Sequence, residues 1–187
     1  MTAAARLVAL LRGVNVGGHH KLAMADLRTA LTAAGCVDVA TYIQSGNAAL
    51  TLPQGRFADP ATWLAEIVSH AAGFDVPVVV RTADELERVV AGNPYPVSDG
   101  KLVHAAFFPT AAAAAAYADI DVDAFLPEHL TLSGNTVYLS LPSGAGRSPL
   151  AAELDRNTRR RHIDPGTSRN WNTVTKLCEL ARNGGTP

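Results

Sequence analysis

Four short segments of the chain combine glycine with amide, hydroxyl and guanidinium side chains, which suit anion recognition better than proton transfer. The first spans residues 12–21 and includes Arg12, Asn15, Gly17, Gly18 and Lys21. Glycines let backbone N–H groups approach a ligand, and the start of the helix predicted to follow favours a negative charge. The spacing matches neither a P-loop nor a dinucleotide fingerprint. We expect this segment to hold a phosphate or carboxylate; a tight turn with a solvated basic tip is the structural alternative.

The second polar segment is the bend of a predicted hairpin and contains Gln44, Ser45 and Asn47. The same tripeptide, Ser-Gly-Asn, recurs 88 residues later between two more short alternating apolar runs. Gly-Asn between such runs is a hairpin signal. In a βαββαβ unit with strand order 4-1-3-2, the loop leaving strand 1 and the bend between strands 2 and 3 share one edge of the sheet. We therefore expect this bend beside Arg12, Asn15 and Lys21, unless it serves turn geometry alone.

The third and fourth polar segments lie in the second half of the chain. Arg147 follows a glycine-rich loop just ahead of a predicted helix cap, a place for an anion clamp or for a plain loop and cap. The fourth segment surrounds a tryptophan and contributes Arg169, Asn170, Trp171 and Asn172. These side chains could stack on a planar group and bind its edge, or form an N-cap cluster around a core tryptophan. Four arginines in residues 156–161 fit a solvated helix face, with phosphate contacts as the alternative.

Local signals predict an α+β fold built from two ferredoxin-like (βαββαβ) halves related by internal duplication. Helices are predicted at 24–34, from Asp59-Pro60 to Gly73, over the polyalanine stretch 111–118, and from Asn172 or Thr173 onward. The hairpins fall at 41–50 and 130–139, and only 166–170 is left for the last strand. The first half with a connecting helix covers 1–92, and the second half with a C-terminal helix covers 93–187.

Composition bounds the class of protein and the partners. The 187 residues are 48% apolar and 18% charged with a net charge of −1, as in an ordinary globular protein. That charge disfavours a general nucleic-acid or anionic-membrane binder. Cys36 and Cys178 are expected to be buried thiols in a reducing compartment. No stretch has the length of a signal-peptide core or a membrane span, so we expect a cytoplasmic protein.

Familiar catalytic patterns are missing from the sequence. It contains no Gly-x-Ser-x-Gly, no His-Glu-x-x-His and no cysteine pair with metal-ligand spacing. His19 and His20 are the obvious candidates for a general base, and they lack a nearby third metal ligand. No catalytic residue is therefore assigned, and neither a metal nor a cofactor is expected.

Three long motifs carry a resemblance to a known family. They are Leu10–Gly18 (LLRGVNVGG), Tyr42–Asn47 (YIQSGN) and Ser168–Val174 (SRNWNTV). In this order they resemble the bacterial domain-of-unknown-function family 1697, whose members read roughly LLRGINVGG, YIQSGN and TRNWNTV. The resemblance implies a two-part α+β fold and no activity. His20 stands where asparagine is common, so the resemblance implies no required role for this histidine.

These observations favour a module that binds a small anionic, partly planar molecule such as a nucleotide or a phosphorylated metabolite. An enzyme that acts on a phosphorylated metabolite is a further alternative. Residues of the first half would hold the anion, and Arg147, Arg169 and Trp171 would close over it. Two alternatives remain: an RNA-binding protein, and polar motifs that are purely structural or form an oligomer interface. The sequence sets neither the ligand nor the oligomeric state.

Overall fold

The computed structural model describes residues 6–54, 58–162 and 166–183. The first set of elements is β1 (Arg6–Leu11), α1 (Met24–Ala33), β2 (Val37–Thr41), β3 (Asn47–Thr51), α2 (Pro60–Ala72) and β4 (Val78–Thr82). Helix α3 (Ala83–Ala91) follows. The second set is β5 (Val103–Phe107), α4 (Ala111–Ala115), η1 (Val122–Phe125), β6 (His129–Ser133), β7 (Thr136–Ser140), η2 (Ala145–Arg147), α5 (Pro149–Arg161) and β8 (Thr167–Asn170). Helix α6 (Trp171–Arg182) ends the described chain.

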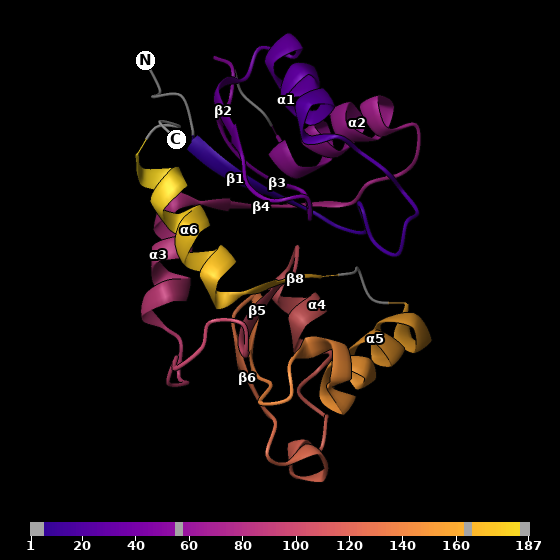
Figure 1. The fold of residues 1–187 in the computed structure, drawn as a ribbon, viewed down its shortest axis with the longest axis vertical. Coiled ribbons are helices and arrows are strands. Elements are labelled where there is room, and N and C mark those ends of the chain that lie inside the picture. The colour runs from indigo at the N-terminus through magenta and orange to yellow at the C-terminus, as the bar shows by residue number, and fades with distance from the viewer. Residues whose placement is uncertain (1–5, 55–57, 163–165, 184–187) are drawn as a thin grey trace. The chain divides into compact units, whose positions relative to one another are not determined.

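The fold is α+β, with two four-stranded antiparallel sheets (Figure 1). The strand orders are β2-β3-β1-β4 and β6-β7-β5-β8, so the two sheets have the same topology. The two predicted hairpins are confirmed, as β2–β3 and β6–β7. Their turns differ, because residues 42–46 connect the first pair and only Gly134 and Asn135 connect the second. The asparagine of the first tripeptide, Asn47, is the first residue of β3, whereas the asparagine of the second, Asn135, directly precedes β7. The two Ser-Gly-Asn tripeptides therefore differ by one residue in their position relative to the strands.

Helices α1 and α2 cover one face of the first sheet (Figure 1). The apolar residues that share this core include Leu7, Leu11, Leu27, Leu31, Leu50 and Leu64. The start and end of α2 follow the sequence signals. The Asp59 carboxylate accepts hydrogen bonds from the N–H groups of Ala61 and Thr62, and Gly73 ends the helix with φ +76°.

The second sheet packs its core against α4 and α5, with Ala106, Val137, Leu139, Tyr117 and Leu150 among the buried residues. The polyalanine helix is shorter than the predicted 111–118 and ends at Ala115. The N–H groups of Tyr117 and Ala118 donate to the carbonyls three residues back, on Ala114 and Ala115. This tighter 3₁₀ turn ends the α-helix and leaves the Tyr117 ring buried.

The contacts divide the chain into two compact units, Met1–Arg88 with Lys176–Pro187 and Val89–Thr175. The sequence places all of the last helix in the second half, whereas this division assigns the end of α6 to the first unit. Arg6 on β1 explains the assignment, since its guanidinium donates to the carbonyls of Leu180 (2.8 Å) and Ala181 (2.9 Å). An ion pair of 3.1 Å between Arg182 and Glu87 adds a second link.

Both cysteines are free thiols and buried, as predicted. Burial raises the pKa of Cys36 and of Cys178 above the ordinary thiol value. Among the described residues, no helix has the length and apolar character needed to cross a membrane.

Candidate functional site

The polar segment after β1 folds back on itself as a miniature hairpin. The N–H of Asn15 donates to the carbonyl of His20 at 2.9 Å, and the N–H of His19 donates to that of Val16 at 3.1 Å. Gly17 and Gly18 form the turn, with φ of +59° and +78°. A Cβ at either position would meet no atom within 4 Å. Glycine is therefore needed here for its backbone conformation and not for space.

Asn15 joins this miniature hairpin to the bend between β2 and β3. Its Nδ2 donates to the carbonyls of Leu22 and Gln44, each at 2.8 Å, and its Oδ1 accepts from the N–H of Leu22 at 3.0 Å. The predicted meeting of these two loops at one edge of the sheet is thus confirmed. Both N–H groups of the Asn15 amide are used in fixing the loops, so this side chain positions them.

The bend itself packs tightly against the loop after β1. The N–H of Leu11 donates to the carbonyl of Gly46 at 2.9 Å. A Cβ on Gly46 would lie 2.5 Å from Cγ2 of Val14 and 2.8 Å from Cβ of Leu11. The Asn47 side chain is fully buried, and its Nδ2 donates to the Tyr42 carbonyl and to Ser45 Oγ. Asn47 and Ser45 therefore shape the bend from inside.

A surface pocket of ≈ 380 Å³ opens beside these loops. Its lining residues are Asn15, Gly18, His19, Lys21, Leu22, Ala23 and Gln44. Of the site residues predicted in the first half, Arg12, Gly17, Ser45 and Asn47 do not line the pocket. Asn15 lines it, but the amide of Asn15 is already bonded to the loops. Arg12 is half-buried, and its backbone N–H donates to the Pro77 carbonyl at 3.0 Å. His20 stacks on Phe74, with ring centroids 4.6 Å apart.

The pocket lies at the N-terminus of α1, which differs from the other α-helices in its capping. The N-cap of α1 is Ala23, which has no side chain able to accept a hydrogen bond. Side-chain oxygens cap α2 through Asp59, α4 through Thr110 and α5 through Ser148. Helix α3 begins with a capping box, in which the N–H of Glu85 donates to Thr82 Oγ1 at 3.2 Å and the N–H of Thr82 donates to Glu85 Oε2 at 2.8 Å. Within the described part of the chain, α1 is thus an α-helix whose N-cap residue offers no side-chain acceptor to its first N–H groups.

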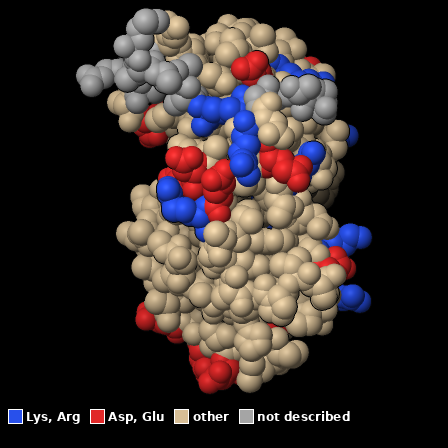
Figure 2. Space-filling model, turned by 90° about the vertical axis from the view of Figure 1, so that its left-hand side faces the viewer, with Lys and Arg blue, Asp and Glu red and all other residues tan. Residues whose placement is uncertain are grey.

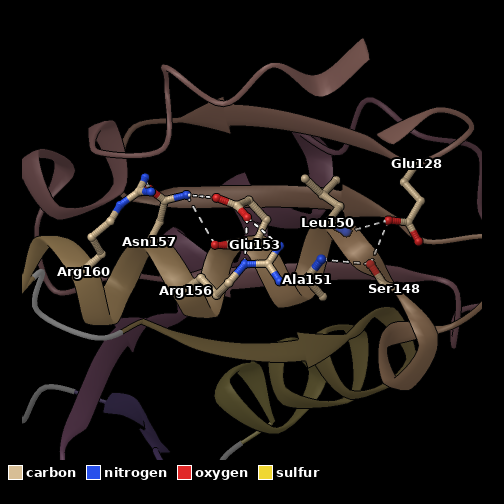
Figure 3. Close-up of polar contacts among 8 residues, drawn as sticks. All are labelled: Glu128, Ser148, Leu150, Ala151, Glu153, Arg156, Asn157 and Arg160. Atoms are coloured by element: carbon tan, nitrogen blue, oxygen red, sulfur yellow. Dashed lines mark hydrogen bonds and ion pairs between the residues drawn. The ribbon is translucent and has the colours of Figure 1, made fainter. Parts of the chain in front are cut away.

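In the second unit, the helix start behind Arg147 already holds a carboxylate (Figure 3). Glu128 is 4% exposed, and its Oε2 accepts hydrogen bonds from Ser148 Oγ at 2.9 Å and from the Leu150 N–H at 3.0 Å. Arg147 is exposed and donates from Nε to the Ser143 carbonyl at 3.2 Å. The N-terminus of α5 is therefore satisfied from within the chain. Sequence reasoning missed Glu128, because no local pattern marks a residue whose partners lie 20 positions away.

The tryptophan segment is largely a core and capping element. Arg169 is 8% exposed and donates from Nη1 to Thr167 Oγ1 (2.7 Å) and the Ser168 carbonyl (2.8 Å); burial lowers its pKa to about 10. Trp171 is 7% exposed, with its ring centroid 6.4 Å from that of Tyr138. Asn170 Oδ1 accepts from the N–H and hydroxyl of Thr173. This cap starts α6 at Trp171, one or two residues before the predicted Asn172 or Thr173, and Asn172 is exposed.

Several charged side chains are paired with neighbours of opposite sign or bonded to the backbone. In the arginine run, Arg156 pairs with Glu153 at 2.6 Å, and Arg161 donates to the Ala116 carbonyl at 2.7 Å. On the face shown in Figure 2, basic and acidic side chains are mixed over α3 and α6, where Lys176 pairs with Glu179 and Arg182 with Glu87. On this face the basic side chains therefore alternate with acidic ones and do not form one continuous positive patch (Figure 2).

Two buried arginines occupy matching places in the two sheets. Arg81 lies opposite Val8 on the central strand of the first sheet, and Arg169 lies opposite Ala105 in the second. Each donates from Nη1 to the carbonyl of the preceding residue at 2.8 Å. The sequence analysis did not single out Arg81. The pattern that could have indicated it is an arginine one residue before the end of the last strand in each half.

Comparison with known proteins places this fold and these loops in one family. Residues 4–138 match the family described as "Protein of unknown function (DUF1697)". The chain belongs to this family. The structure of this chain is similar to that of the conserved bacterial protein SP0830 from Streptococcus pneumoniae. The TM-score is 0.64 and the sequence identity 24%, and the match covers 96% of this chain and 100% of the other. At that identity the likeness concerns the fold alone. A search of curated proteins found no match.

Proposed function

We propose that this DUF1697 protein is a binding module for small molecules that carry a phosphate or carboxylate group, and that the anion sits in the pocket at the start of α1. The observation that carries the proposal is the coincidence of three features: the pocket of ≈ 380 Å³, the lysine that lines it, and a helix start with no side-chain cap. The lysine and the helix start favour a negatively charged ligand, and the pocket provides the space for it.

The physical argument rests on unsatisfied donors and on charge. The first N–H groups of an α-helix have no partner within the helix, and the helix dipole places a partial positive charge there. Lys21 is exposed and adds a full positive charge at the pocket wall. Gly18 has no side chain, so its backbone is open to close approach. Asp26, in the first turn of α1, lies outside the lining residues of the pocket.

The size of the pocket sets the class of ligand. A volume of ≈ 380 Å³ is near the lower end of small-molecule sites, about 300–1,000 Å³. We therefore propose a phosphorylated metabolite or a mononucleotide held by its phosphate. Trp171 is a core residue and is left out of this proposal. The residues proposed to contact the ligand are Lys21, Gly18, His19 and Gln44. An enzyme that acts on a phosphorylated metabolite would also have to bind it, so the same site would serve that activity.

Isothermal titration with inorganic phosphate, glucose 6-phosphate and AMP tests the proposal. Lys21→Gln should weaken binding about tenfold or more, because a charged hydrogen bond contributes about 1.5–3 kcal/mol. Lys101→Gln is the matched control, since it removes the same charge from an exposed lysine outside the pocket. Absence of binding by all three probes, or equal affinity in the two variants, would refute the proposed site.

We also propose that the two units are ferredoxin-like halves that arose by duplication. Their common strand order and the matching positions of Arg81 and Arg169 support this origin. Alignment of the two halves across many family members tests it. Sequence similarity between halves, centred on the strands, is expected. Halves that are no more alike than unrelated βαββαβ units would contradict it.

A further inference from the structure

We infer that the second unit contains a separate site for a small zwitterion, an α-amino acid with an apolar side chain. A pocket of ≈ 300 Å³ lies along α5 and the segment around η1. Its polar lining residues carry both signs of charge: Asp119, Asp121, Glu153, Asn157, Arg160 and Arg161. None of them belongs to the proposed anion pocket, so this inference is independent of the proposed function.

A buried amide fixes the basic side of this pocket. Asn157 is 3% exposed, its Nδ2 donates to Glu153 Oε1 at 2.8 Å, and its Oδ1 accepts from Arg160 Nη2 at 3.0 Å (Figure 3). Arg160 is thereby held at the pocket by one of its five N–H groups. Glu153 is already neutralised by Arg156, which donates to Oε2 from Nη2 and Nε at 2.6 and 2.9 Å. The remaining donors of Arg160 suit a carboxylate.

The acidic side of the pocket has one carboxylate in excess. Asp119 faces Arg161, with Oδ2 and Nη1 3.6 Å apart, and the same Nη1 donates to the Ala116 carbonyl. Asp121 also lines the pocket, and among the described residues its carboxylate forms no ion pair. One guanidinium with spare donors and one carboxylate without a cation therefore line the same small volume.

Apolar side chains complete the pocket. Ile120, Ala124 and Phe125 line it together with the charged groups, and Ile120 and Phe125 also pack against the core of this unit. A ligand that satisfies all three features bears a carboxylate for Arg160, an ammonium group for Asp121 and an apolar body. Small α-amino acids with apolar or aromatic side chains have this chemistry, and ≈ 300 Å³ is sufficient for a small molecule.

Titration of the full chain with L-phenylalanine, followed by ¹H–¹⁵N NMR and calorimetry, tests the site. Two probes each lack one charge: 3-phenylpropanoate has no ammonium group and 2-phenylethylamine has no carboxylate. We expect L-phenylalanine to shift the amide signals of Asp121, Phe125 and Asn157, and each truncated probe to bind about tenfold more weakly or worse. L-leucine should bind at the same place.

Matched variants separate this site from a general surface effect. Arg160→Gln and Asp121→Asn should each weaken L-phenylalanine binding about tenfold or more. Arg159→Gln and Asp123→Asn make the same changes of charge at exposed neighbours outside the pocket and should leave binding unchanged. Lys21→Gln should have no effect on this titration. Absence of shifts at the pocket with either amino acid, equal binding of the truncated probes, or equal loss in the control variants would overturn the inference.

Discussion

The side-chain amide of Asn15 donates to the backbone carbonyl of Gln44 at 2.8 Å, which ties together two loops whose residues are 29 positions apart. The same side chain exchanges two further bonds with the backbone of Leu22, directly before the N-cap of α1. One residue therefore holds the walls of the proposed anion pocket in register with the start of the helix.

Replacing Asn15 by alanine should lower the free energy of unfolding by about 2–3 kcal/mol, because three hydrogen bonds are lost at once. Asn15 also has φ +55°, a conformation that destabilises alanine but that glycine adopts without a steric penalty. Asn15→Gly should therefore be less destabilising than Asn15→Ala by about 1 kcal/mol. Urea unfolding measures both. Wild-type stability in the alanine variant would show that the loops are held together by other contacts.

The two glycines of the Ser-Gly-Asn tripeptides should respond differently to the same substitution. Gly46→Ala introduces a Cβ within 3 Å of Val14 and Leu11 at φ +80°, so a loss of about 2–4 kcal/mol is expected. Gly134→Ala is the matched control, because its φ is +57° but no atom lies within 4 Å of the new Cβ. It should cost about 1 kcal/mol. Thermal or urea unfolding of the pair checks the difference, and equal losses would contradict it.

Arg169→Ala should destabilise the second unit by about 2–4 kcal/mol, because the side chain is 8% exposed and its guanidinium bonds to Thr167 and Ser168. Phosphate affinity at the α1 pocket should not change once the variant is measured at a temperature where it is folded. Ser168→Ala, an exposed neighbour on the same strand, is the control. A stable variant that has lost phosphate binding would instead assign Arg169 to a ligand.

His104 should make stability depend on pH below neutrality. Burial lowers the pKa of His104 below its ordinary value of 6.5, and among the described residues its Nδ1 has no hydrogen-bond partner. Below about pH 6.5 the unfolded chain takes up a proton that the folded chain resists. The folded state is therefore most stable above that pH and loses stability as the pH falls from there toward the lower folded value.

Leucine is the natural replacement, since Leu7 occupies the matching register position in the first sheet. His104→Leu should raise the free energy of unfolding by about 1 kcal/mol at pH 7.5, and by more at pH 5.5. Leu7→His is the reciprocal change and should lower it at both pH values. Urea unfolding at the two pH values tests the pair. The same pH dependence in wild type and His104→Leu would assign it to other groups.

Much of the fold was predictable because its signals are local. Asp59-Pro60, Gly73 and the Thr82–Glu85 box mark helix ends within a few residues of their partners. The two hairpins followed from alternating apolar runs around Gly-Asn. The meeting of Asn15 with the bend at Gln44 was also predictable, because the order of elements implies the order of strands, and that order brings these loops to one edge.

The remaining features depend on tertiary packing, which local patterns do not encode. Tryptophan and arginine occur both in ligand sites and in protein cores, so the residue types of Trp171 and Arg169 do not distinguish these roles. The burial of both residues does. The repeat of Ser-Gly-Asn suggested equivalent bends, but the carbonyl that accepts from the central strand belongs to Gly46 in one unit and to Asn135 in the other. The connection has five residues in the first hairpin and two in the second, and the tripeptide is placed one position apart in the two strand registers.

Arg6 donates to the carbonyls of Leu180 and Ala181, so β1 is bonded to α6, whose residues follow it by 174 and 175 positions. When β1 to β4 have left the ribosome, the end of α6 is still untranslated, and the first unit lacks part of its own structure. The first unit can therefore be completed only after the whole of the second unit has been synthesised. Cleaving the chain between the units would not yield two self-sufficient fragments, because the first would have been cut away from its final turn.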